Sequence, residues 1–167
     1  MSAKNNIVKL SFLPAIALCA LCPGRVAAAT LTINVSVTGD INFGGLDPGA
    51  TGGGFRVRPG GTSGPLLGST VSSLGITPVT PGQIQIIAST GVPIDLSVTN
   101  ATYTLTGPGG SMTVNDFHIG GDSSGRSVVV TLASTSEVFP VGATLNVGAG
   151  QGAGVYSTVF SVNAAYQ

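Results

Sequence analysis

Apolar and polar residues alternate at both ends of the chain. At the C-terminus, one face of the alternating pattern consists of Tyr156, Thr158, Phe160, Val162, Ala164 and Tyr166. Near the N-terminus, a second alternating face consists of Leu31, Ile33, Val35, Val37, Gly39, Ile41 and Phe43. Successive side chains of a β-strand point to opposite faces, so a period of two indicates a strand. Both ends are therefore predicted to be strands with one apolar face.

The residues between the two ends also have strand character. Alternating or β-branched runs are FRVR, QIQIIAST, PIDLSVTN, TYTLT, SMTVNDFHI, RSVVVTLA and ATLNVG, and clusters of Gly, Pro, Asn and Asp separate them. TYTLT and SMTV flank the turn sequence GPGG and predict a hairpin. Gly and Pro are scattered through residues 46–82, where we expect long loops. The pattern predicts an all-β fold, an immunoglobulin-like antiparallel β-sandwich.

The first 29 residues have the pattern of a secretory signal peptide. Lys4 and Lys9 precede the apolar run LSFLPAIALCALC, and small residues follow it. The run is shorter than the roughly 20 apolar residues of a membrane-spanning helix. Cleavage is expected after Ala29, or after Ala28. Residues 30–167 are then a single exported domain that passes through the periplasm and is secreted or held at the cell surface.

Removal of the signal peptide changes the composition. Residues 30–167 contain no Cys and no Lys, and three Arg stand against six acidic residues, a net charge of −3. A disulfide framework is excluded there, and so is the clustered basic surface that nucleic acid requires. Arg56 and Arg58 alternate with apolar neighbours, and we interpret them as a solvated strand face.

One motif suggests catalysis. Residues 121–125, GDSSG, match the G-x-S-x-G pattern of serine hydrolases, and His118 is the only histidine. In a nucleophile elbow, however, the histidine follows the serine and a helix follows the turn. Here the histidine comes first and the strand-like RSVVVTLA follows, so a hydrolase is the least favoured function. His118 with Asp116 is also too small a set for zinc. We expect no enzyme activity, no metal and no cofactor.

The C-terminal residues resemble those of pilins assembled by the chaperone–usher pathway. In those subunits a glycine lies fourteen residues from the C-terminus, an alternating apolar strand follows, and a tyrosine is penultimate. Gly154 and Tyr166 occupy these two positions, with Phe160 and Val162 on the alternating face. The stretch VGATLNVGAGQGAGVYSTVFSVNAAY is also similar to a family of uncharacterised secreted bacterial β-sandwich proteins akin to spore-coat-U-like pilins. That family often has an early Phe-Gly pair like Phe43-Gly44.

The resemblance implies roles for both ends. A periplasmic chaperone would grip the terminal strand, and an outer-membrane usher would guide assembly. The N-terminal extension would be the donor strand that completes the sheet of a neighbouring copy. The implied interface residues are Leu31, Ile33, Val35 and Val37 in the donor and Gly154, Tyr156, Phe160, Val162 and Tyr166 in the terminal strand. The intradomain disulfide of many classical pilins is missing from residues 30–167.

Two functions follow from two placements of residues 30–38. If this segment is donated, the protein is a structural, pilin-like subunit of a surface fimbria that serves adhesion. Residues Leu31–Val37 would span about 23 Å as a strand. If the segment is the first strand of its own domain, the protein is a free-standing secreted β-sandwich that binds a matrix or surface partner.

Overall fold

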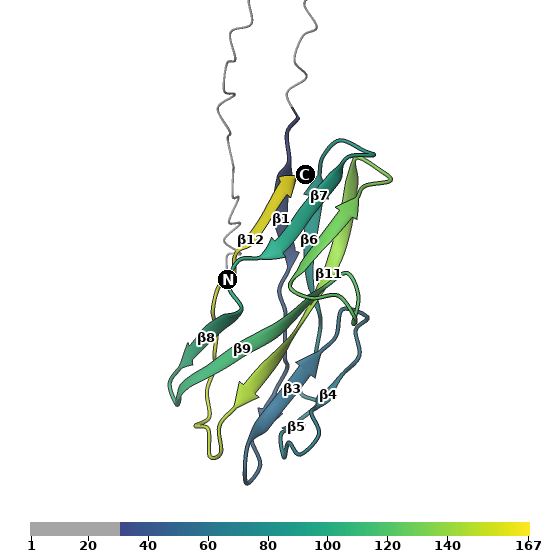
Figure 1. Cartoon of the computed structure of the whole chain (residues 1–167). Helices are drawn as coiled ribbons and strands as arrows, with labels where there is room; N and C mark the ends of the chain where they lie inside the picture. The colour runs from purple at the N-terminus through teal and green to yellow at the C-terminus, as the bar shows by residue number, and fades with distance from the viewer. Residues whose placement is uncertain (1–30) are drawn as a thin grey trace, which may run out of the picture.

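The computed structural model describes residues 31–167, which form an antiparallel all-β sandwich (Figure 1). The predicted signal peptide and its cleavage site at Ala29 lie outside the described residues. The strands within residues 31–167 are β1 (Asn34–Gly39), β2 (Leu46–Asp47), β3 (Gly53–Val57), β4 (Ser63–Pro65), β5 (Ser72–Ser73), β6 (Gly82–Ile87), β7 (Pro93–Val98), β8 (Thr102–Gly107), β9 (Gly110–Ile119), β10 (Ser127–Thr131), β11 (Ser136–Val147) and β12 (Val162–Tyr166). The predicted all-β sandwich is confirmed.

The strands form two main sheets. In the larger sheet the order is β1-β6-β11-β3-β4, and the β8–β9 hairpin joins it because β9 also pairs with β11. The smaller sheet has the order β10-β7-β12, and β2 and β5 form a separate short pair. The first and last strands, β1 and β12, are thus edge strands of different sheets. They lie close together at one end of the sandwich (Figure 1).

The core lies between the two sheets. Alternate residues of β6, β7 and β11 point inward and are almost completely buried, in particular Ile84, Ile86, Ile94, Leu96, Val98, Val141, Ala143 and Leu145. Complete burial of one such aliphatic side chain stabilises the fold by about 1.5–3 kcal/mol. The period-two pattern of the sequence is therefore the source of the core.

Two local predictions are confirmed, the hairpin and the loops of residues 46–82. β8 and β9 form the predicted hairpin, with Gly107 opposite Gly110 across the turn. Residues 46–82 consist mainly of loops between short strands. Within the described residues, no helix is long and apolar enough to cross a membrane.

Two strands differ from the prediction in length. The sequence predicts a strand at ATLNVG, but β11 already begins at Ser136 and continues through Pro140. Proline is tolerated because the pairing of β11 with β9 begins one residue later, at Val141. The terminal strand is shorter than its pattern predicts, because regular pairing is confined to Val162–Tyr166. The residues before it lie along a groove.

Candidate functional site

An apolar groove of about 1130 Å³ runs between the first and the last segments of residues 31–167, which are called the two chain ends below. One wall is formed by β1 and the segment 40–46, and the other wall by residues 151–162. In Figure 1, these two stretches descend from the end of the sandwich where β1 and β12 meet. The floor is formed by the inward side chains of β8, β9 and β11, namely Tyr103, Leu105, Met112, Val114, Phe117, Leu145 and Val147.

The first wall presents an unpaired strand edge. β1 pairs with β6 along one edge only and ends its sheet. Its apolar face, which includes Val35 and Val37, continues into Ile41 and Phe43, and none of these four side chains is fully buried. Val37 is 42% exposed. Val35 and Val37 lie opposite Ile86 and Ile84 of β6, which point inward, but no strand of the described chain covers the two valines.

The second wall is extended but only sparsely paired. Ser157 exchanges backbone hydrogen bonds with Thr106, and the carbonyl of Ser161 accepts one from Thr99. Among the described residues, no backbone hydrogen bond is made by residues 158–160. Their N–H and C=O groups are available to another strand.

An aromatic cluster positions this wall on the floor. Phe160 packs against Tyr103 and Phe117, with ring centroids 6.4 and 6.0 Å apart, and Tyr103 meets Phe117 edge-on at 5.7 Å. The Tyr103 hydroxyl also accepts a hydrogen bond from the Ser161 N–H at 3.0 Å. The alternating register of the C-terminus therefore places Phe160 in the groove, as the sequence pattern predicts.

Close contacts with the β8–β9 hairpin hold residues 151–156, the part of the second wall farthest from β12. The Tyr156 hydroxyl donates to the carbonyl of Gly152 at 2.5 Å and accepts from Gln151 at 2.9 Å. A Cβ at Gly109 would lie 2.4 Å from this hydroxyl oxygen, and a Cβ at Gly154 would lie 2.8 Å from Cδ of Pro108. Glycine at both positions lets the segment 151–156 pack on the tip of the β8–β9 hairpin.

Residues 33–166 match the family model of a domain of unknown function, DUF4402. The chain belongs to the DUF4402 family. The match covers almost the whole part of the chain that the structure describes, so both walls and the floor of the groove lie inside the DUF4402 domain. Comparison with curated proteins and with solved structures gave no match.

The structure brings six of the sequence-predicted interface residues to the groove of the DUF4402 domain. They are Val35, Val37, Gly154, Tyr156, Phe160 and Val162. Leu31, Ile33 and Tyr166 lie outside it. The Tyr166 hydroxyl instead accepts a hydrogen bond from the Ser89 N–H at 3.1 Å and donates one to the Thr32 carbonyl at 3.3 Å. The penultimate tyrosine thus joins the two ends of the domain.

The residues of the groove floor were not predicted as interface residues from the sequence. Tyr103, Leu105, Met112 and Val114 alternate along the predicted hairpin, so their inward direction is readable from the sequence. Their place beneath both chain ends is not, because it depends on how the two sheets pack.

The GDSSG loop of the DUF4402 domain does not assemble a serine–histidine pair. Nδ1 of His118 contacts the carbonyl oxygen of Ser124, and its Nε2 lies 3.3 Å from Oδ1 of Asp116. The Ser124 hydroxyl donates to the Gly121 carbonyl at 2.5 Å, and Ser123 makes no hydrogen bond to His118 in the described structure. Residues 31–167 also contain no group of three or more His, Cys, Asp or Glu that could hold a metal ion.

Proposed function

We propose that the protein is a structural, pilin-like subunit of a bacterial surface fimbria, assembled by donor-strand exchange and serving surface adhesion. The observation that carries this proposal is the apolar groove between the two chain ends. Its floor is apolar, β1 has one unpaired edge, and residues 158–160 make no backbone hydrogen bond within the described chain. A β-strand with alternating apolar side chains satisfies both features, because main-chain hydrogen bonds hold it and side chains fill the groove.

The proposed donor is Leu31–Val37 of a neighbouring copy. Its four apolar side chains alternate as an added strand requires. Burying them would contribute at most about 6–12 kcal/mol, at about 1.5–3 kcal/mol each. In the monomer, β1 pairs with β6 and forms the first wall of the groove. Donation must therefore first release Asn34–Val37 from that ladder, and the incoming strand of a neighbour would lie between β6 and residues 157–161, in the space that β1 vacates. The proposed periplasmic chaperone and usher would hold the subunit open during this step.

The alternative is a free-standing secreted β-sandwich that binds a matrix or surface partner. The observation that favours it is the same β1–β6 pairing, because a first strand held in its own domain makes the fold self-sufficient. The two functions differ in whether residues 30–37 are needed by the chain itself or by a neighbour.

Size-exclusion chromatography with light scattering separates the two functions. The chain beginning at Thr30 is compared with a chain beginning at Thr38, each with and without a Thr30–Val37 peptide. Strand exchange predicts oligomers of the longer chain, and a shorter chain that stays monomeric and is stabilised by the peptide. The control peptide carries Ser at positions 31, 33, 35 and 37 and should have no effect. A longer chain that is a stable monomer at all concentrations contradicts exchange and supports the alternative.

A further inference from the structure

Charged residues are scarce in this domain, yet several gather on one outer face. Residues 31–167 contain nine charged side chains and one histidine. Four of the nine, together with the histidine, lie on or beside β3 and β9, and they are Arg56, Arg58, Asp116, Asp122 and His118. Nearly half of the charged side chains of residues 31–167 therefore lie at one place.

A hydrogen-bond network fixes the first of the two arginines. Nε of Arg56 donates to the Thr144 hydroxyl at 3.2 Å, and one terminal nitrogen donates to Oδ2 of Asp116. The Thr144 hydroxyl donates to the same Asp116 oxygen at 3.2 Å, and Thr144 is buried. The guanidinium group of Arg56 is thus held in one orientation before any ligand arrives.

The backbone is unusual at the acidic member of this network. Asp116 has a φ of 54° and is the one non-glycine residue with positive φ among residues 31–167. It lies at a β-bulge, where Asp116 and Phe117 of β9 face Ala143 of β11 alone. Backbone strain of this kind is concentrated at functional sites.

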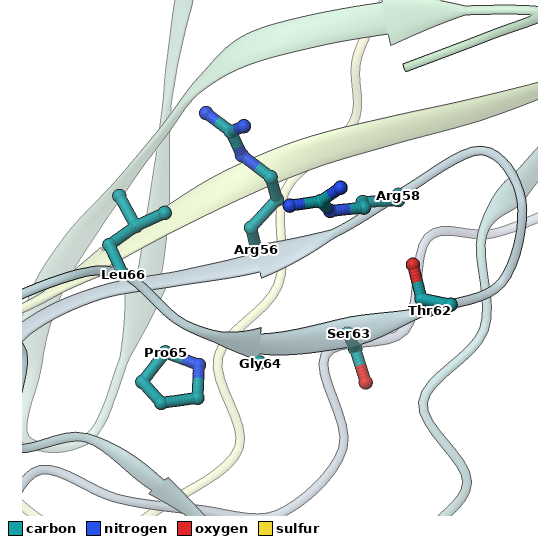
Figure 2. A pocket seen from close by; sticks show the side chains of 7 residues that line it. All are labelled: Arg56, Arg58, Thr62, Ser63, Gly64, Pro65 and Leu66. Carbon is teal, nitrogen blue, oxygen red and sulfur yellow. The ribbon is translucent and has the colours of Figure 1, made fainter.

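A recess of about 230 Å³ lies beside the network, on the β3–β4 hairpin. Figure 2 shows Arg56, Arg58, Thr62 and Leu66 on one side of the hairpin. Gly64 is paired with Arg56 across the two strands, and a Cβ built on Gly64 would meet nothing within 4 Å. The missing side chain at Gly64 leaves the space between the arginines and Leu66 open.

Hydrogen-bond donors around the recess are unused. The second terminal nitrogen of Arg56 makes no hydrogen bond to the described residues. The guanidinium group of Arg58 makes one polar contact, in which its terminal nitrogen lies 3.5 Å from Oδ2 of Asp122. Both side chains are half-exposed. An exposed pair at this distance is weak, so a stronger anion can displace Asp122.

We propose that this recess binds an anionic sugar unit of an acidic polysaccharide. The free terminal nitrogen of Arg56 and the guanidinium group of Arg58 would both donate hydrogen bonds to the carboxylate or sulfate. Thr62 would bond a ring hydroxyl, and Leu66 would pack against the ring carbons. The recess is smaller than the roughly 300–1,000 Å³ of sites for drug-sized ligands, so it takes a single unit of the chain.

The small number of cations at the recess favours a polysaccharide over nucleic acid. Nucleic acid requires a row of cations along its closely spaced phosphates, and only two arginines are present here. A single recess binds its sugar unit weakly. A repeating polymer contacts many copies of the domain on one surface, and the combined binding is therefore tighter. This inference goes beyond the proposed function because it supplies an adhesive target without requiring strand exchange.

The test measures retention of the full chain on three immobilised polymers: polygalacturonate, dextran sulfate and neutral dextran. The chain should bind one or both anionic polymers and not dextran; polygalacturonate alone identifies the carboxylate as the ligand, and dextran sulfate alone the sulfate. Arg58→Gln and Gly64→Leu should each weaken binding at least tenfold. Gly64→Leu fills the recess at a half-buried position where a Cβ would meet nothing within 4 Å.

Two matched variants control for charge and bulk. Thr131→Asp makes the same −1 change in net charge at an exposed position of β10, and Gly125→Leu adds the same side chain where a Cβ meets nothing. Both should bind as the unsubstituted chain does. The proposal is overturned if neither anionic polymer is bound, if dextran is bound equally, or if control and site variants lose affinity alike. Light scattering on the same variants reports assembly separately, so failure of strand exchange is distinguishable from failure of this site.

Discussion

The two halves of the sandwich follow the same sequence pattern but pack differently. In the closed half, inward residues of β6, β7 and β11 are almost completely buried, and Val141 is 0% exposed. In the open half, Val37 has the inward register of β1 and is 42% exposed. Alternation alone therefore fixes the direction of a side chain. Burial also requires cover on the other side, which the floor residues Val114 and Phe117 have and Val37 in the groove wall lacks.

The largest expected difference between the halves is in stability. Val141→Ala should lower the free energy of unfolding by about 1.5–3 kcal/mol, because it removes two buried methyl groups. Val37→Ala makes the same chemical change in the groove wall and should cost less than about 1 kcal/mol. Urea unfolding of both variants measures the two values. Equal losses would mean that the groove is a closed core in solution.

The close contacts at the far end of the groove give the next largest effect. Gly109→Ala places a methyl group against the Tyr156 hydroxyl and the Cα of Gly152. Separating these segments should cost about 1–3 kcal/mol. Gly121→Ala is the control, since a Cβ there meets nothing within 4 Å. Thermal unfolding of both variants checks the contact, and an unchanged midpoint for Gly109→Ala would show that residues 151–156 do not rest on the hairpin.

A smaller effect is expected where the chain ends meet. Tyr166→Phe removes the hydrogen bonds to Ser89 and Thr32 but keeps the ring. The loss should be about 0.5–1.5 kcal/mol. Amide exchange should become faster at Ser89, whose N–H loses its acceptor, and not at Ile84 or Ile86 in the closed half. Unchanged exchange at Ser89 would contradict the bridge between the chain ends.

Much of the fold was predictable from the sequence because it depends on local pattern. The alternating runs, the GPGG turn and the loops of residues 46–82 all have local causes. β11 was predicted only in part, because Pro140 interrupts the alternating pattern. Pro140 fits into the strand opposite Gln83 of β6 because pairing with β9 begins only at Val141. The terminal strand was predicted too long, because residues 155–161 have a strand pattern without a full partner.

The candidate sites were less predictable than the strands. The pattern placed Tyr156, Phe160 and Val162 on one face, and all three line the groove. The groove itself depends on how the two sheets pack. The recess beside Arg58 depends on Gly64 lying opposite Arg56, which is a matter of strand register. Neither the packing of the sheets nor this register can be predicted from a short stretch of sequence.

The proposed strand exchange requires the groove to accept a β-strand, and amide hydrogen exchange tests this requirement most directly. Exchange is measured on the chain beginning at Thr30, with and without an excess of the Thr30–Val37 peptide. We predict slower exchange at residues 158–160, whose N–H groups have no backbone partner among the described residues. Unchanged exchange at residues 158–160 would contradict this requirement, even if residues of β6 became protected.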